Sequence, residues 1–144
     1  MTTVNRVRSI AAGVVAVVIP LGLLARRFRS QSDGEGFTGF VALYLADTLW
    51  PVMFYGFARF VWPLACWKRV AVGVLLFTWS IEISQLVQAD WLLWLRAQPG
   101  IGFALGDRFS WSDLKCCLVG TVLAAATDVF LRRKRTAEIA AGSG

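Results

Sequence analysis

The chain has 144 residues, 57% of them hydrophobic, and its mean hydropathy of +0.60 excludes an ordinary soluble domain. The net charge of +6 comes from basic residues at the ends of apolar runs, which indicates membrane topology and leaves no basic face for nucleic acid. Because the sequence contains three cysteines and no histidine, we expect neither a metal site nor a cofactor, and the cysteines are expected to fill apolar space.

The first apolar run, residues 10–24, predicts a membrane helix. A span needs about 20 residues, so this helix is expected to begin near Val4 or Val7. A secretory signal peptide also opens with basic residues followed by an apolar run. No small-x-small cleavage pattern follows Leu24, which favours an uncleaved first span, and a polar loop is expected over residues 26–36.

Residues 37–60 predict a second span that carries an ionisable group, Asp47. Pro51 removes a backbone donor and can kink the helix just past the aspartate. Two interpretations of Asp47 are open. Either Thr48 or Tyr44 satisfies the carboxylate, which then only locks helix packing, or the carboxylate takes part in function.

After a loop over residues 59–69, residues 70–88 predict the third span. Thr78, Glu82 and Gln85 follow the i, i+4, i+7 spacing that places side chains on one helical face. An ionisable group inside lipid is costly, so Glu82 is expected to face a partner or a wet cavity.

Residues 90–96 are apolar and aromatic but too few to cross a bilayer, which predicts a short interfacial helix. Residues 111–131 predict the fourth span, with Ser110 and Ser112 as N-cap oxygens and Asp113 in the first turn. A ridge of small residues, which permits the close approach of another helix, then repeats every four positions: Cys116, Gly120 and Ala124.

Together these elements predict an all-α membrane protein with four transmembrane helices plus a short interfacial helix in the third loop. Residues 1–135 are expected to form a single bundle, and residues 136–144 a disordered tail. Four spans place both termini on one side, whose excess of basic residues predicts cytoplasmic termini. The basic residues of that side are Arg6, Arg8, Arg59, Lys68, Arg69 and 132–135, against Arg26, Arg27, Arg29, Arg96 and Arg108 opposite.

Depth along the predicted helices brings several polar residues to the extracytoplasmic boundary of the membrane. Asp47 lies about 15 Å below the start of its span, at about 1.5 Å per residue. The other residues lie in the outer third of the third span, in the loop after it, or at the start of the fourth span. We predict that these residues form one ligand-binding pocket: Glu82, Gln85, Arg96, Asp113 and Asp47.

Four segments of this region form an ordered pattern: Ser80-Ile-Glu82-Ile-Ser-Gln85, Arg96, Ser112-Asp113-Leu114 and Gly120. An I-E-x-x-Q helix followed by an arginine, an aspartate and a glycine in the last helix resembles the VanZ-like membrane proteins. The resemblance implies a role in resistance to glycopeptide antibiotics, especially teicoplanin. This chain departs from the VanZ pattern in a longer stretch between Gln85 and Asp113, with Trp91 and Trp94 inserted.

Further segments extend the pattern over roughly residues 21–128: Tyr44-Leu-Ala-Asp47-Thr-Leu-Trp50, Arg59, Ile81-Glu82-x-x-Gln85-Leu86, Leu95-Arg96 and Trp111-Ser-Asp113-Leu114. This ordered set is similar to a family of short bacterial integral-membrane proteins known only as a domain of unknown function. The resemblance implies a multi-pass protein of the bacterial cytoplasmic membrane, without an assigned activity.

These features predict a cell-envelope accessory protein whose pocket binds a membrane lipid or a lipid-linked envelope precursor. Arg96 would bind a phosphate or carboxylate through its planar fork, and the acidic residues would contact amines or sugar hydroxyls. Partnership in a homo-oligomer, or with another membrane protein, is open.

Four alternatives stay open. The resemblance favours a VanZ-like resistance factor. A membrane enzyme acting on a lipid-linked substrate could use Glu82 and Asp113 as an acid–base pair, although no Ser or Cys nucleophile is paired with a base. A small proton-coupled exporter could use Asp47 or Glu82, and would have to dimerise. Finally, Glu82, Arg96 and Asp113 could be an ion network that only fixes helix register.

Overall fold

The computed structural model describes residues 3–31, 37–98 and 109–142. Within these ranges the chain forms helices and no strand, so the all-α prediction is confirmed. The short helix expected after the third long one is present with the expected bounds. The helices are α1 (Thr3–Gln31), α2 (Phe37–Val61), α3 (Trp67–Ser84), α4 (Asp90–Arg96) and α6 (Trp111–Gly142).

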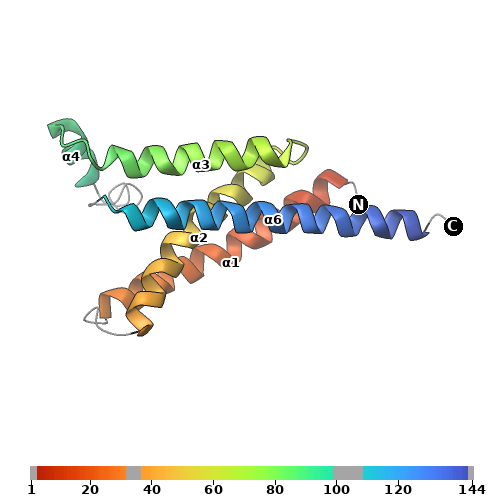
Figure 1. Ribbon diagram of the computed structural model, residues 1–144, viewed down its shortest axis with the longest axis horizontal. Helices are drawn as coiled ribbons and strands as arrows, with labels where there is room; N and C mark the ends of the chain where they lie inside the picture. Colours follow the sequence, from red (N-terminus) through yellow and green to blue (C-terminus); the bar gives the residue numbers. More distant parts are fainter. Residues whose placement is uncertain (1–2, 32–36, 99–108, 143–144) are drawn as a thin grey trace.

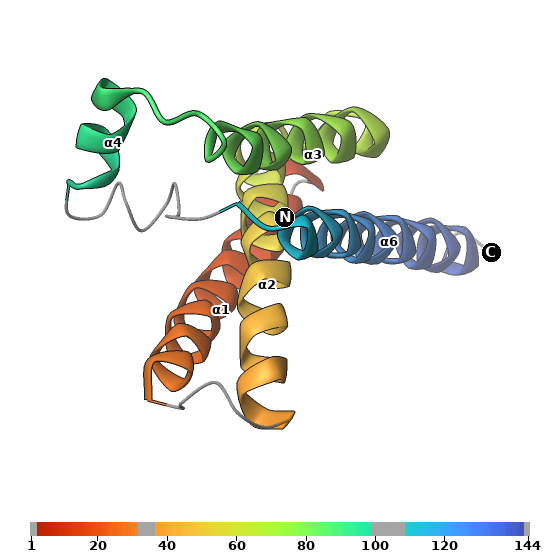
Figure 2. The same ribbon diagram turned by 60° about the vertical axis from the view of Figure 1, so that its left-hand side comes forward.

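The long helices form a bundle in which α2 is central. Helix α1 packs along α2, α6 crosses α2, and α3 packs against both α6 and α2, while the short α4 stands apart from the bundle (Figures 1 and 2). Arg8 Nε near the start of α1 donates to the carbonyl oxygen of Phe60 near the end of α2 at 3.1 Å. These two helices are therefore antiparallel, as α3 and α6 also are (Figure 1).

The crossing of α2 and α6 is made possible by Gly120. A Cβ atom at this position would lie 2.6 Å from Pro51 Cγ and would also collide with the carbonyl oxygen of Thr48. Cys116, one turn earlier in α6, is also buried. The close approach predicted for the small-residue ridge is therefore confirmed at its middle residue.

The apolar core lies where α2, α3 and α6 meet. Its fully buried members are Tyr55 from α2, Val70 and Val74 from α3, and Ala125 from α6. Phe54 packs against this cluster and makes an edge-to-face contact with Phe77 of α3, with 5.0 Å between ring centroids. The core therefore fixes the relative positions of three helices that each carry polar side chains.

Two of the described helices are long and apolar enough to cross a membrane, over Val4–Leu24 and Trp111–Lys134. The first begins where the sequence predicted. Helices α2 and α3 were also expected to span. Helix α2 carries Asp47 and Arg59, and the 18-residue α3 carries basic residues in its first turn and Glu82 near its end, which lowers the hydropathy of both.

Helix boundaries differ from the expected ones at three places. Helix α1 continues to Gln31, where a loop was expected from residue 26, because arginine and glutamine are good helix formers. Helix α3 ends at Ser84, earlier than expected, in a final turn tightened by bonds between residues three apart, such as Gln85 N–H to Glu82 O at 3.1 Å. Helix α6 continues to Gly142, through the residues expected to be a tail, which are rich in alanine.

Candidate functional site

The end of α3 turns a polar face into the bundle. Thr78 is 1% exposed and Gln85 5% exposed, while Glu82 between them is half-buried. The prediction that these three residues share one helical face is consistent with their burial on the inner side of α3. Thr78 Oγ1 donates to the carbonyl oxygen of Val74 at 3.0 Å, so its hydroxyl is satisfied within the helix.

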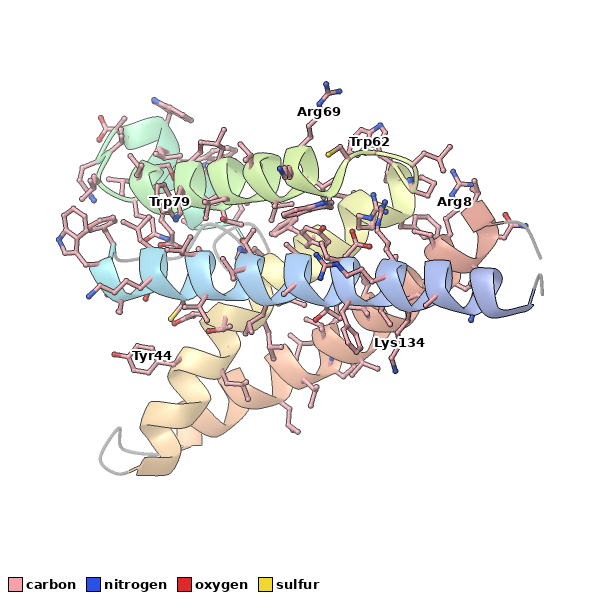
Figure 3. The ribbon with its side chains drawn as sticks, turned by 45° about the vertical axis from the view of Figure 1, so that its right-hand side comes forward. Arg8, Tyr44, Trp62, Arg69, Trp79 and Lys134 are labelled. Carbon is pink, nitrogen blue, oxygen red and sulfur yellow. The ribbon has the colours of Figure 1, made fainter. Side chains whose placement is uncertain are left out.

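The start of α6 lies beside this face. Ser110 Oγ accepts the backbone N–H of Ser112 at 3.3 Å, as expected for an N-cap, and Ser112 Oγ donates to Asp113 Oδ1 at 3.2 Å. Trp79 Nε1 of α3 donates to the carbonyl oxygen of Leu114 at 3.2 Å, and Figure 3 shows this indole directed towards α6. The bond holds the first turn of α6 against the last turns of α3.

Two adjacent cysteines in α6 lie near carboxylates that belong to three different helices. The Cys117 side chain interacts with Thr78 of α3 and lies in the electrostatic field of Glu82 and Asp113. Cys116 points to α2 instead, where it interacts with Thr48 and lies in the field of Asp47. Both thiols are free and buried, and they point in different directions because neighbouring residues on a helix do so.

The structure therefore places Glu82 and Asp113 near Cys117, and Asp47 near Cys116, which points to another helix. We call this group the acidic-end cluster: Asp47, Glu82, Gln85 and Asp113. The fifth predicted residue, Arg96, belongs to α4, which lies at the same end of the bundle (Figure 1). Its side chain lies outside the described part of the structure. That these residues bind a ligand stays a prediction.

A second polar cluster, which the sequence interpretation did not identify, lies at the other end of the bundle. Its central residue is Arg59 of α2, only 4% exposed. Arg59 donates to three backbone carbonyl oxygens of the α2–α3 connection: Pro63 at 2.8 Å, Ala65 at 2.9 Å and Trp62 at 3.3 Å. These hydrogen bonds hold the α2–α3 connection against the C-terminal end of α2.

The same guanidinium reaches across to α6. Arg59 Nε lies 3.5 Å from Asp128 Oδ2, and the same oxygen accepts the Tyr55 hydroxyl at 3.1 Å. Arg132 lies one turn further along α6, and its Nε donates to both carboxylate oxygens of Asp128, at 3.1 and 3.2 Å. We call this group the basic-end cluster: Tyr55, Arg59, Asp128 and Arg132.

The missed cluster had a weak signal in the sequence. Tyr55 and Arg59, like Asp128 and Arg132, are four residues apart and therefore share a helical face. Arg59 was counted as a basic residue that sets topology and as part of the family pattern, but not as a member of a cluster. Because pairing between helices depends on the crossing of α2 and α6, sequence spacing could indicate the two faces but not their contact.

The two clusters differ in chemistry. The acidic-end cluster offers carboxylate oxygens, which accept hydrogen bonds from ammonium and hydroxyl groups. Among the described residues, no three His, Cys, Asp or Glu side chains are arranged to hold a metal ion. The basic-end cluster pairs opposite charges with one another, so its atoms are largely engaged inside the protein.

The sequence model of one protein family, described as "Protein of unknown function (DUF2809)", matches residues 37–121. This range is more than half of the chain and contains all five predicted site residues. Asp128 and Arg132 of the basic-end cluster lie beyond it. No solved structure matches the chain.

Proposed function

We propose that this chain, which belongs to the DUF2809 family, is a small multi-pass membrane protein whose acidic-end cluster binds the polar headgroup of a membrane lipid or lipid-linked envelope precursor. The proposal is supported by the carboxylates of three helices near Cys116 and Cys117 of α6, together with the buried amide of Gln85. Ionisable groups within membrane-embedded helices are costly and commonly mark a ligand or ion site.

The surface of the bundle supports the membrane placement. All four long helices expose large apolar side chains, more than a soluble protein presents to water. Charged residues lower the hydropathy of α2 and α3. However, Arg59 of α2 and the neutral Gln85 after α3 are buried in the bundle, which leaves apolar surface for lipid. Exposed examples are Val17, Leu23, Phe57, Phe60, Val72, Leu76, Phe77, Val119, Val122 and Leu123.

The distribution of charge and tryptophan supports an orientation. Arg8 and Lys134 lie towards one end of the bundle, which we assign to the cytoplasm of a bacterial cell (Figure 3). At the opposite end Trp91 and Trp94 of α4 are each 66% exposed, which suits the headgroup layer. The acidic-end cluster would then open to the extracytoplasmic side.

The composition of the cluster suggests the chemistry of its ligand. Carboxylate oxygens accept hydrogen bonds from ammonium and sugar hydroxyl groups, which favours a ligand that brings such groups. A phosphate on the same headgroup would be bound by Arg96, as the sequence predicts. A VanZ-like role in glycopeptide resistance would be a narrower form of this proposal, and the resemblance of the motif residues is what favours it.

Native mass spectrometry of the protein extracted from membranes tests the proposal. We expect the wild-type protein to retain an amine- or sugar-bearing lipid, and the double variant Glu82→Gln with Asp113→Asn to lose it. Asp90→Asn, which removes an exposed carboxylate of α4 outside the cluster, is the matched control and should retain the lipid. Equal retention by all three proteins, or recovery of the wild-type protein from the soluble fraction, would overturn the proposal.

A further inference from the structure

A groove runs along the basic-end half of the bundle, between α1 and α6 and over α2. Helices α1 and α6 both flank α2 but make little contact with each other, so the space above α2 is open on one side. The groove has a volume of about 170 Å³. Its walls are apolar: Ile10, Ala11 and Val14 from α1, and Leu123, Ala124 and Leu131 from α6.

Along this groove the lining changes from apolar to charged. Arg59 and Asp128 of the basic-end cluster line it, together with Thr127. Two guanidinium groups, those of Arg59 and Arg132, share the single carboxylate of Asp128, so the cluster carries a net charge of +1. Arg8, two residues before the groove-lining Ile10, adds an exposed cation that also stacks on Phe60.

We propose that this groove holds one acyl chain of an anionic phospholipid, whose phosphate lies beside Arg132 and Arg8. The lipid would come from the leaflet at the basic end of the bundle, opposite the leaflet that the acidic-end cluster faces. Apolar walls suit the chain, and the net positive charge at the groove's end suits the phosphate. The proposal rests on the membrane placement in the proposed function, but not on ligand binding by the acidic-end cluster.

The size of the groove favours an acyl chain over a helix of a second copy. A helix with its side chains is about 10–12 Å in diameter, so only side chains of a second copy could enter a groove of about 170 Å³, whereas a hydrocarbon chain can lie in the groove along part of its length. A single hydrocarbon chain is thinner and flexible, and it can follow the space between Ala11 and Ala124. No partner backbone is needed to satisfy hydrogen bonds there.

Lipid counting by native mass spectrometry tests this groove. The protein is released from nanodiscs made of phosphatidylglycerol, and in parallel from nanodiscs made of phosphatidylcholine. Thr127→Phe places a ring in the groove from an exposed position of α6, and Leu123→Trp fills it from the same wall. Val122→Phe makes the same change in bulk on α6 outside the groove and is the control.

We expect the wild-type protein and Val122→Phe to retain one more phosphatidylglycerol per chain than the two groove-filling variants. Phosphatidylcholine should be retained less by the wild-type protein, and Arg8→Gln should weaken phosphatidylglycerol retention more than Arg6→Gln. Equal lipid counts for filled and open grooves, or equal retention of both lipids, would overturn the proposal. Failure of the acidic-end cluster to bind lipid is distinguishable, because it is measured on Glu82→Gln with Asp113→Asn, which leave this groove intact.

Discussion

The two polar clusters of this bundle differ in the charges that they contain. The basic-end cluster joins Arg59 and Arg132 to one carboxylate, Asp128, and uses the remaining donors of Arg59 on backbone carbonyls. The acidic-end cluster instead gathers three carboxylates around Cys116 and Cys117. Removing one partner of a buried pair of opposite charges is strongly destabilising, so the basic-end cluster is expected to hold α2 and α6 together.

This difference suggests that the basic-end cluster stabilises the fold and that the acidic-end cluster binds a ligand. Arg59 ties the α2–α3 connection to the end of α2 and both to α6, so three elements depend on one side chain. Under the proposed function, the carboxylates of the acidic-end cluster serve a ligand that brings complementary groups. Active and binding sites commonly lower the stability of the protein that carries them.

The largest expected effect comes from breaking the basic-end cluster. Arg59→Ala removes three hydrogen bonds to the connection and leaves Asp128 without its buried partner, which should destabilise the protein by about 3–5 kcal/mol. Thermal unfolding in detergent measures this loss. Arg133→Ala, an exposed arginine of the same end, should change the unfolding temperature little. Equal effects of the two variants would show that Arg59 is not the fold-holding residue.

A smaller loss is expected from a change at Gly120, the residue that allows α6 to cross α2 closely. Gly120→Leu would drive a side chain into Pro51 and the Thr48 carbonyl, and overpacking of this kind costs about 1–3 kcal/mol. Gly73→Leu is the matched control, because nothing lies within 4 Å of a Cβ at that position of α3. Both variants are compared by thermal unfolding. Similar unfolding temperatures would mean that α2 and α6 do not approach closely.

The acidic-end cluster should respond with the opposite sign. Glu82→Gln removes one of three like charges and keeps the shape of the side chain, so the ligand-free protein should become more stable by about 0.5–2 kcal/mol. The unfolding temperature of delipidated protein in detergent gives this difference. A clear loss of stability would indicate instead that Glu82 belongs to an ion network that fixes helix register.

The smallest expected effect concerns the thiols at the two ends. The backbone N–H groups of Lys68 and Arg69 at the start of α3, together with the charges of both side chains, lower the pKa of the exposed Cys66 thiol. Its alkylation by iodoacetamide should therefore reach half its maximal rate at a pH below that of an ordinary cysteine. Lys68→Gln should move this pH upwards, and Lys115→Gln should not.

Cys116 and Cys117 provide the contrast in the same experiment. Both are buried in α6, so they should react only when the protein unfolds. Mass spectrometry of the alkylated protein distinguishes the three positions. Reaction of Cys117 at the rate of Cys66 in the folded protein would contradict the burial of the acidic-end cluster.

The sequence predicted the helices well because each has a local cause. The run of apolar residues from Val4 gave the start of the first span, and the aromatic stretch at residues 90–96 gave α4 with its observed bounds. The helix ends were less predictable. Residues 26–31 and 136–142 are polar yet good helix formers, so composition suggested a loop and a tail where the backbone continues as helix.

The sequence predicted only in part which helix each polar side chain contacts. The i, i+4, i+7 spacing placed Thr78, Glu82 and Gln85 on one face, but it did not indicate that Thr78 would meet Cys117 of α6. The pairing of Arg59 with Asp128 depends on residues 69 positions apart, brought together by the close approach at Gly120. Contacts of that kind follow from how helices cross, which a single sequence does not specify.

The most direct test of the account is whether lipid stabilises the protein through the acidic-end cluster. A ligand that binds only the folded state raises the unfolding temperature, so delipidated wild-type protein and Glu82→Gln are melted with and without extracted membrane lipid. We expect added lipid to raise the unfolding temperature of the wild-type protein clearly more than that of Glu82→Gln, in which only the groove between α1 and α6 still binds lipid. An equal rise in both proteins, or no rise in the wild-type protein, would contradict this account.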